Sequence, residues 1–495
     1  MSRHDVDVAV IGGGAGGLTA AGVSAAFGAK TVLIERNRLG GDCTWYGCIP
    51  SKTMLSIARD TARARQLEDR GVEIADVSVD FKKVMATVRD AMRRIYESSD
   101  SPRILTSRGI EVIDGSARFV DDRSLAVRPK DENGEEITVR FRSCIIAAGS
   151  SPVVPPIPGL DEIGFLTNET LFDLEEQPEH LMVLGAGPIG VEMAQAFARL
   201  GSRVTVVSLD PTILPRDEER CSRSVLRQLV ADGVDFRFGE TLQEVSGEPG
   251  KFVASVGPPD RIKDEIEADA MLIAIGRQPN LIELELEKTG VKLDRTGLPI
   301  DEHCRTNRKH IFAVGDVTPN MQFTHLAENM GRVAAVNAVL RLPVKRFEQS
   351  VVPWVTYTDP EIAHVGATAT DLGKSGKKFD LIEIPYSRID RAVTDGAEQG
   401  VVLVYRQKKE ILGASVVGTG AGEIISEFAL AMRNGIGLRE LSDTIHPYPT
   451  LSLGARRAAD QYYVRTHKRW MSRLVQKWHR YRGEIPDYVG TEEVI

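Results

Sequence analysis

The chain has few cysteines, no long apolar run and no excess of positive charge, and each shortage excludes a class of protein. Five cysteines in 495 residues form an odd, sparse set, which excludes a secreted scaffold held together by disulfides. No run of about 18 apolar residues is present, so no membrane-spanning helix is expected. Because 62 Lys and Arg face 70 Asp and Glu, the net charge of −8 excludes nucleic-acid binding by bulk positive charge.

The remaining composition is typical of a globular protein of several domains. Apolar residues make up 42% of the chain and charged residues 27%, and a chain of this length holds about three domains. The first apolar stretch contains Asp5 and Asp7 and lacks the basic start of a signal peptide, so we expect a cytoplasmic protein. The 45 glycines direct attention to tight turns and to places where the backbone approaches a ligand.

A strand, a glycine-rich turn, a helix and a second strand are expected at the start of the chain. The runs that predict them are residues 6–11, 18–27 and 31–34. Gly12, Gly14 and Gly17 fit the pattern G-x-G-x-x-G, in which the backbone and a helix N-terminus bind a pyrophosphate. Glu35 ends the second strand, where an acid binds a ribose diol, so FAD and NAD both suit this site.

The same unit recurs in the middle of the chain. Its parts are the runs 181–184, 191–200 and 204–207 and the loop glycines Gly185, Gly187 and Gly190. Two such units, each in its strand–helix–strand context, are far more specific than one glycine match. Ser208 stands where an acid would repel a 2′-phosphate, and Arg216 follows it closely enough to bind one, whereas Asp210 argues the other way. NADPH is therefore slightly favoured over NADH at this second site.

Cys43 and Cys48 follow the first unit with four residues between them. Such a pair can close a short redox disulfide at the start of a helix, where the helix N-terminus and a nearby cation favour the thiolate. Lys52, one turn beyond Cys48, supplies the cation. A zinc site is disfavoured because no second pair or histidine cluster accompanies them, and two inert thiols are also disfavoured. No metal site is predicted, and the other thiols are interpreted as packing or incidental residues: Cys144, Cys221 and Cys304.

With these motifs in this order, the chain resembles the flavoprotein pyridine nucleotide–disulfide oxidoreductases, which include dihydrolipoamide dehydrogenase, glutathione reductase and mercuric reductase. The resemblance implies FAD at the first unit and NAD(P)H at the second. It implies that Cys48 is the thiolate beside the flavin, that Cys43 exchanges with the acceptor, and that Lys52 and Glu192 form an ion pair near the flavin. It also implies a homodimer whose active site is completed by the partner subunit.

The resemblance assigns further cofactor contacts and a domain order. Asp316 would bind the ribityl chain of FAD, and the other positions placed at the cofactors are Gly41, Lys52, Ala117, Gly149, Gly276 and His325. The expected fold is α/β, with two Rossmann-like domains and a C-terminal α+β dimerisation domain in which short strands surround one helix at 421–434. The expected boundaries are 1–150 and 276–346 for the FAD domain, 151–275 for the NAD(P) domain, 347–464 for the dimerisation domain and 465–495 for a basic tail.

The C-terminal segment departs from the disulfide-reducing members of the family. Those members carry a His base backed by a Glu, and this chain has Tyr448 and Leu453 at the two positions. A tyrosine has a pKa of about 10 and is a poor general base near neutral pH. His446 is expected to point elsewhere, with service as a substitute base as the less favoured alternative. Reduction of lipoamide or glutathione is thereby put in doubt, and Tyr448 is kept as a candidate catalytic residue.

The acceptor stays open between several small-molecule classes. A tyrosine at this position resembles mercuric reductase, but residues 487–495 lack the paired cysteines of that enzyme's tail. Trp45 and Tyr46, inside the cysteine loop, suit either a flat acceptor such as a quinone or tighter packing. The favoured hypothesis is a reductase of a thiol-reactive acceptor, either a disulfide or a metal ion. The alternative is an NAD(P)H diaphorase or quinone reductase that acts at the flavin, and a non-catalytic component of an assembly is the third.

A basic, amphipathic tail ends the sequence. Seven Lys and Arg residues lie within 465–482, and no Asp or Glu occurs within 461–483. Trp470, Leu474 and Trp478 recur every four residues and fall on one face of a predicted helix. We expect this helix to pack on its own dimer with its basic face in solvent. Contact with a membrane surface and docking to an acidic partner are the alternatives.

Overall fold

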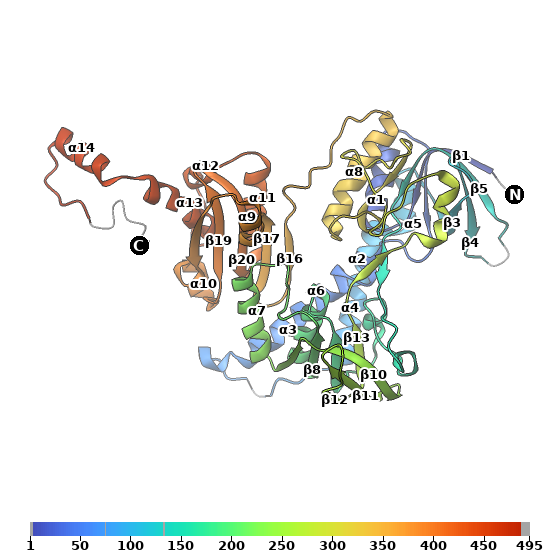
Figure 1. Cartoon of the computed structure of the whole chain (residues 1–495), viewed down its shortest axis with the longest axis horizontal. Coiled ribbons are helices and arrows are strands. Elements are labelled where there is room, and N and C mark those ends of the chain that lie inside the picture. The colour runs from blue at the N-terminus through green and yellow to red at the C-terminus, as the bar shows by residue number, and fades with distance from the viewer. Residues whose placement is uncertain (1–2, 75, 132–133, 487–495) are drawn as a thin grey trace. The chain divides into compact units, whose positions relative to one another are not determined.

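The computed structural model describes residues 3–74, 76–131 and 134–486, and the chain divides into two compact units (Figure 1). The first unit comprises the described residues within 1–211 and 233–348, and the second comprises those within 212–232 and 349–495. Each unit has its own buried apolar core.

A mostly parallel six-stranded sheet forms the centre of the first unit. β1 lies between β2 and β5, and β3 and β15 extend the parallel part on its two sides, whereas β4 pairs antiparallel with β3 and β5. The central strands are continuous apolar runs because both faces of a parallel sheet are covered. The strands are β1 (Arg3–Ile11), β2 (Thr31–Glu35), β3 (Ile110–Phe119), β4 (Ser124–Pro129), β5 (Ile137–Ile146) and β15 (Ile311–Ala313).

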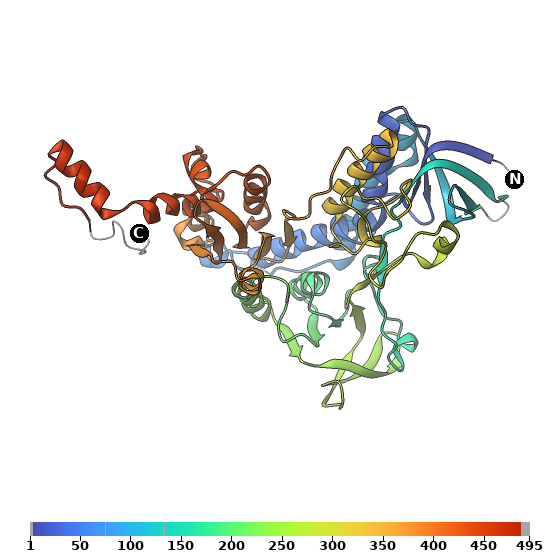
Figure 2. The same ribbon diagram turned by 45° about the horizontal axis from the view of Figure 1, so that its top comes forward.

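Helices α1 (Ala15–Ala26) and α8 (Thr324–Leu340) lie side by side against this sheet (Figures 1 and 2). Their close approach depends on glycine, because a Cβ atom on Gly331 would stand 2.4 Å from the carbonyl oxygen of Gly16. The small side chains of α1 therefore serve helix–helix packing as well as the turn that precedes the helix.

A second parallel sheet, in the order β13–β7–β8–β9, belongs to the same unit and carries α6 (Pro188–Leu200). An antiparallel sheet, β10–β11–β12, shares an apolar core with β7, β8 and β13. This arrangement is the second nucleotide-binding fold that the repeated glycine motif predicts. The strands are β7 (His180–Leu184), β8 (Arg203–Ser208), β9 (Val234–Phe238), β10 (Thr241–Glu248), β11 (Lys251–Gly257), β12 (Asp264–Ala268) and β13 (Ala270–Ile273).

The chain crosses twice between the two nucleotide-binding sheets, and the crossings pair with each other. β6 (Ser150–Pro152) leaves the first sheet after β5, β14 (Arg277–Pro279) returns after β13, and the two run antiparallel. In the same unit α3 packs against α4 and α6. The remaining helices of the unit are α2 (Gly41–Trp45), α3 (Cys48–Arg65), α4 (Phe81–Ile95) and α5 (Pro102–Ser107).

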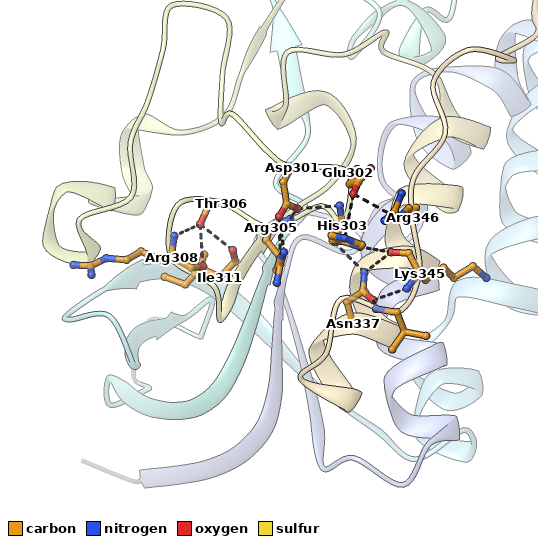
Figure 3. Close-up of polar contacts among 11 residues, drawn as sticks. Asp301, Glu302, His303, Arg305, Thr306, Arg308, Ile311, Asn337, Lys345 and Arg346 are labelled. Atoms are coloured by element: carbon orange, nitrogen blue, oxygen red, sulfur yellow. Dashed lines mark hydrogen bonds and ion pairs between the residues drawn. The ribbon is translucent and has the colours of Figure 1, made fainter.

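A buried asparagine fixes the last stretch of the first unit (Figure 3). Asn337, on α8, donates from its amide nitrogen to the carbonyl oxygens of His303 (3.2 Å) and Lys345 (2.8 Å). Its amide oxygen accepts from the backbone N–H groups of Val344 and Lys345, both at 2.9 Å. All four hydrogen-bonding positions of the side chain are thus used, so the chain after α8 is held against the loop that contains His303.

A five-stranded antiparallel sheet, in the order β16–β17–β20–β19–β18, forms the second unit. α11 packs on β17 and β20, and α13 packs on β18 and β19, around one apolar core. The elements are β16 (Trp354–Thr356), β17 (Glu361–Gly366), α9 (Ala369–Ser375), β18 (Asp380–Pro385), α10 (Asp390–Asp395), β19 (Val401–Gln407), β20 (Glu410–Gly418), α11 (Ala421–Arg433), α12 (Leu438–Asp443), α13 (Leu453–Thr466) and α14 (Arg469–His479).

Helix α7 (Glu219–Ala231), which connects β8 to β9 in sequence, belongs to the second unit and packs on β17 and β20. Two hydrogen bonds hold the turn that precedes it. Trp354 donates from Nε1 to a carboxylate oxygen of Asp217 (2.8 Å), and the Tyr405 hydroxyl donates to Glu218 (2.7 Å).

The α/β fold class and the separate α+β unit are confirmed, but some expected elements were wrong. The apolar runs 144–149, 271–276 and 311–316 each predict a strand over their whole length, but the strands end earlier, at Ile146, Ile273 and Ala313, and a glycine with positive φ follows each of them. Those glycines are Gly149 (69°), Gly276 (140°) and Gly315 (71°).

The expectation of one helix in the C-terminal domain was also wrong. Helices α9, α10, α12 and α13 accompany α11. The first three have seven residues or fewer, too few for an apolar period to be visible. α13 buries mainly small residues, among them Ala455, Ala458 and Ala459. Across the described ranges, no helix combines the length and the apolar character needed to cross a bilayer.

Candidate active site

The two cysteines of the short loop lie together at the ends of two helices. Cys43 is on α2, and Cys48 is the first residue of α3. Their thiols are hydrogen-bonded to each other, and neither is joined in a disulfide. Both side chains are partly buried. The structure therefore holds the dithiol form of the pair that the sequence predicts.

The surroundings of the two thiols separate their acidities. The hydrogen bond from Cys43 lowers the pKa of the Cys48 thiol to about 6, and the Thr324 hydroxyl and the Lys52 charge act in the same direction against burial. The same hydrogen bond, together with burial, raises the pKa of Cys43 above its ordinary value. Near neutral pH the dithiol form is thus a Cys48 thiolate beside a protonated Cys43.

Thr324 is the group of this site that the sequence analysis missed. Its Oγ1 atom lies 3.5 Å from the sulfur of Cys48, and it is the first residue of α8. A helix N-terminus adds a partial positive charge beside a thiolate. The neighbouring His325, proposed as a cofactor contact, stacks on Phe323 with ring centroids 5.4 Å apart. The assignment of His325 as a cofactor contact was the one feature of the sequence that pointed to the start of α8.

Lys52 and Glu192 form an ion pair within the first unit. Lys52, on α3, lies 2.8 Å and 3.1 Å from the two carboxylate oxygens of Glu192, on α6. Glu192 is almost fully buried, whereas a third of the Lys52 side chain is exposed. The pair therefore keeps a buried carboxylate compensated and holds a positive charge one helical turn from Cys48.

A second polar network, also missed from sequence, adjoins Cys43. Asp42 forms an ion pair with Arg277, the first residue of β14. Arg277 also donates from Nε to the Ser150 hydroxyl (2.7 Å), which in turn donates to Asp316 (2.7 Å). Burial raises the pKa of Asp42 to about 6, although the Arg277 charge opposes the shift. The cysteine loop is thus tied to the crossing strands and to the candidate ribityl-binding acid.

The first glycine loop has room for a ligand only because of its glycines. A Cβ atom on Gly17 would lie 1.8 Å from the carbonyl oxygen of Gly12, and one on Gly41 would lie 2.6 Å from the Cα atom of Gly14. Gly12 itself has φ +100°. The backbone of this loop is therefore closely packed and opens on the N-terminus of α1, as a pyrophosphate requires.

Glu35 closes the same loop from the end of β2. Its carboxylate accepts from the backbone N–H groups of Gly13 (2.5 Å) and Asn37 (2.6 Å). Each oxygen keeps a further acceptor position, which suits a ribose diol. The loop glycines, the helix N-terminus and Glu35 together fit an adenine dinucleotide such as FAD.

The second glycine loop shows the same close backbone contacts as the first, except at one glycine that has free space around it. A Cβ atom on Gly190 would stand 2.0 Å from the carbonyl oxygen of Gly185, whereas one on Gly187 would meet nothing within 4 Å. Gly185 and Gly190 are thus required by packing, and Gly187 leaves space for a pyrophosphate.

The two residues considered for a 2′-phosphate, Ser208 and Arg216, belong to different units of the chain. Ser208 is buried at the end of β8, and its hydroxyl accepts from the backbone N–H of Asp210 (3.2 Å). Arg216 is exposed in the segment before α7. Of the other positions placed at the cofactors, Ala117 is part of β3 and packs against the apolar core of the first sheet.

In the candidate base segment of the second unit, the imidazole ring of His446 is engaged by neighbouring groups. Nε2 of His446 lies 2.6 Å from a carboxylate oxygen of Glu427, and Nδ1 lies 2.9 Å from the carbonyl oxygen of Thr444. Both ring nitrogens therefore lie within hydrogen-bonding distance of an oxygen atom of the second unit. Tyr448 is 72% exposed, and Leu453 is buried in the apolar core.

Trp45, one of the two aromatic residues of the cysteine loop, is occupied by packing. Its indole N–H donates to the carbonyl oxygen of Leu39 (2.7 Å), its ring centroid lies 5.2 Å from that of Tyr96, and the Arg38 guanidinium lies 5.0 Å from the ring. The packing interpretation is favoured over a platform for a flat acceptor.

These features define a redox enzyme with two dinucleotide folds and a paired thiol. Residues 6–331 match the family described as pyridine nucleotide-disulphide oxidoreductase, and residues 352–459 match its dimerisation domain. The chain belongs to this family. It is therefore an oxidoreductase that uses FAD and NAD(P)H, and its dimerisation domain supports a homodimer.

Dihydrolipoyl dehydrogenases and mercuric reductases are both among the relatives of this chain. Dihydrolipoyl dehydrogenase 2 of Haloarcula marismortui is 34% identical over 456 residues, covering 92% of this chain and 96% of the relative. A mercuric reductase of Staphylococcus aureus is 32% identical over 460 residues, covering 92% and 82%. Among solved structures, the Cu(II) complex of the HOCl-induced flavoprotein disulfide reductase RclA from Escherichia coli matches with a TM-score of 0.79 at 27% identity, covering 92% and 99%.

Proposed function

We propose that this enzyme reduces a thiophilic metal ion, Hg(II) or Cu(II), with electrons from NAD(P)H that pass through Cys43 and Cys48. The observation that carries the proposal is a polarised thiol pair, together with a C-terminal segment in which Leu453 is buried and both ring nitrogens of His446 contact oxygen atoms. A mercuric reductase and a Cu(II) complex among the similar proteins support this choice of acceptor.

Each group of the site has a part in this reaction. Bound FAD supplies the step between hydride transfer and dithiol chemistry. The Cys48 thiolate, stabilised by Thr324 and Lys52, is a soft ligand ready near neutral pH, and Cys43 supplies a second sulfur after losing its proton to solvent. The overall reaction balances as NAD(P)H + Hg²⁺ → NAD(P)⁺ + H⁺ + Hg⁰, or with two Cu²⁺ giving two Cu⁺.

The same residues argue against a disulfide acceptor. Reduction of a disulfide forms a thiol, and that step needs a proton donor beside the leaving sulfur. Leu453 stands in the apolar core where the disulfide reductases have a Glu, and both ring nitrogens of His446 are engaged. Tyr448 then serves as an oxygen ligand or a positioning group for the metal ion, contributed by the partner subunit of the homodimer.

The finer assignments complete the proposal. NADPH is the preferred nucleotide, since Ser208 replaces the acid expected at the end of β8, and Asp210 is the residue that opposes this preference. The site residues named from the sequence bind the two cofactors as assigned there. The FAD domain spans 1–150 and 276–346, the NAD(P) domain 151–275, and the dimerisation domain 347–464. Residues 487–495, which contain no cysteine, lie outside the described residues.

A steady-state panel tests the proposed acceptor. Hg(II), Cu(II), lipoamide, glutathione disulfide and a benzoquinone are offered with NADPH or NADH to the enzyme and to Cys43→Ser and Cys48→Ser. We expect metal-ion reduction that falls at least about a hundredfold in both variants. Cys221→Ala, which removes a thiol buried in the second unit, is the control and should retain full activity.

Two results would contradict the proposal. Equal or faster turnover of lipoamide than of either metal ion would assign the enzyme to disulfide exchange. Quinone reduction that dominates the panel and survives both cysteine substitutions would place the reaction at the flavin, as the diaphorase alternative predicts.

A further inference from the structure

Helix α14 presents a continuous apolar face that the structure leaves uncovered. Its large apolar residues are spaced three and four apart and so fall on one side of the helix. No residue of α14 is buried, and the exposed fractions of these side chains range from 39% to 80%. The face, called here the α14 apolar face, consists of Trp470, Met471, Leu474, Val475 and Trp478.

The other side of the helix is basic. Arg469, Arg473 and Lys477 recur at the same helical spacing and form a stripe beside the apolar face, and Arg480 follows the end of the helix. The seven Lys and Arg of 465–482, with no acid in 461–483, leave 55 basic against 70 acidic residues in the rest of the chain. Residues 465–482 therefore carry a net positive charge, whereas the chain as a whole is acidic.

The tail lies beyond the part of the chain that the family shares. The match to the dimerisation domain ends at residue 459, and α13 ends at Thr466. Arg465 donates from Nη1 to the carbonyl oxygen of Leu381 on β18 (3.0 Å), which anchors the end of α13. The next helix begins three residues later, at Arg469. Helix α14 thus lies outside the segment that matches the family's dimerisation domain.

A bilayer surface suits both sides of this helix at once. Helices with Trp and Leu on one face and Lys and Arg on the other lie in the lipid interface, with the apolar face among the upper acyl chains. Tryptophan rings concentrate at the level of the headgroups, and anionic lipids attract basic residues at the surface. We propose that α14 docks this enzyme on a membrane surface that contains anionic lipid.

Vesicle binding by the full-length holoenzyme tests this proposal without using the electron acceptor, so its outcome is independent of the proposed function. Co-sedimentation is measured with vesicles of phosphatidylcholine alone and of phosphatidylcholine with phosphatidylglycerol at about three to one. We expect binding to the anionic vesicles only, weakening as salt is raised.

Two double variants separate the contributions of the two sides. Trp470→Ala with Trp478→Ala should lower vesicle affinity at least about tenfold, because it removes the largest apolar groups. Arg473→Gln with Lys477→Gln should lower it about twentyfold and reduce its salt dependence. The matched control, Lys292→Gln with Arg295→Gln, changes net charge equally at two exposed positions of the first unit and should bind as the parent does.

Three outcomes would overturn the proposal. The first is no binding to anionic vesicles at low salt. The second is equal loss of binding in the control and the tail variants, which would mean non-specific charge attraction. The third is conversion of the dimer to a monomer by Trp470→Ala with Trp478→Ala in sedimentation velocity, which would assign the α14 apolar face to a second copy of the chain.

Discussion

At the scale of single residues, the redox pair depends on hydrogen bonds more than on formal charge. Cys43 and Thr324 both hydrogen-bond to the sulfur of Cys48, and these bonds lower its pKa more than the charge of Lys52 does. A donor directed at a thiolate in a partly buried site is not weakened by solvent, whereas Lys52 shares its charge with Glu192. The hydroxyl of Thr324 is therefore the group to remove in order to test how the thiolate is held.

Thr324→Val should raise the pKa of Cys48 by about one pH unit, because one donor to the thiolate is lost while the shape of the side chain is kept. With the pKa lowered to about 6, the thiolate forms above that pH and is lost below it. Titration of the thiolate absorbance of the reduced enzyme measures the change. Thr53→Val, which removes a hydroxyl bonded to the Ile49 carbonyl on α3, should leave the titration in place. An unshifted midpoint in Thr324→Val would show that the hydroxyl has no such role.

The sequence predicts the local parts of this site and misses those contributed from a distance. Cys43, Cys48 and Lys52 lie within ten residues: helical spacing places Lys52 one turn beyond Cys48, and a short connection joins Cys43 to the start of the same helix. Thr324 is 276 residues from Cys48, and Arg277 is 235 residues from Asp42. Such contacts are set by the packing of α8 and β14 against the cysteine loop, which no local pattern encodes.

At the scale of elements, the turn before α1 shows how packing selects a residue type. Gly17 is on the first turn of α1, and its missing side chain allows the helix to contact the carbonyl oxygen of Gly12. Gly22, one and a half turns further along the same helix, has nothing within 4 Å of the position that a Cβ atom would take. Substitution of Gly17 therefore tests the requirement for cofactor binding, whereas substitution of Gly22 tests only the general effect of glycine in a helix.

Gly17→Ala should lower the flavin content of the purified enzyme by about tenfold or more, because the added carbon displaces the pyrophosphate-binding turn. Gly22→Ala should keep its flavin and stabilise the protein by about 0.5–1 kcal/mol through helix propensity. The ratio of flavin to protein absorbance and the unfolding midpoint measure both effects. A full flavin load in Gly17→Ala would refute the packing argument.

Another prediction concerns the attachment of α7 to the sheet of the second unit. Burial raises the pKa of Asp217 to about 6, although its hydrogen bond with Trp354 opposes the shift. Between the unfolded pKa of about 4 and the folded value, the native state holds more protons, so this carboxyl lowers stability as the pH rises. Asp217→Asn should then be more stable than the parent above pH 6, by about 1–2 kcal/mol.

Urea unfolding at a series of pH values checks this prediction. The advantage of Asp217→Asn should disappear below about pH 4, where the parent carboxyl is protonated in both states. Glu410→Gln, at an exposed position of β20, is the control and should change stability little at any pH. A less stable Asp217→Asn at high pH would mean that the charged hydrogen bond with Trp354 outweighs the cost of burial.

At the scale of the whole molecule, the second unit contains the segment that carries a His base and a Glu in the disulfide-reducing members of the family. In this chain, Tyr448 and Leu453 stand at those two positions. The two nucleotide folds and the separate sheet follow from repeated motifs, which is why the architecture could be predicted from sequence. The engagement of His446 by Glu427 could not be, because the pair joins α11 to a loop 19 residues away. That pair and the buried Leu453 leave Tyr448 as an exposed polar side chain of the segment.

If Tyr448 acts in the active site of the partner subunit, two inactive variants should restore each other in a hybrid dimer. We expect Tyr448→Phe to lower metal-ion reduction about tenfold and Cys48→Ser to abolish it. A hybrid of the two, purified through different tags on the two subunits, has one site with an intact thiol pair and an intact tyrosine. Its activity should be about half that of the parent dimer. A Cys43→Ser and Cys48→Ser hybrid has no intact pair and should remain inactive. Failure of the first hybrid to recover activity would place Tyr448 outside the partner's site.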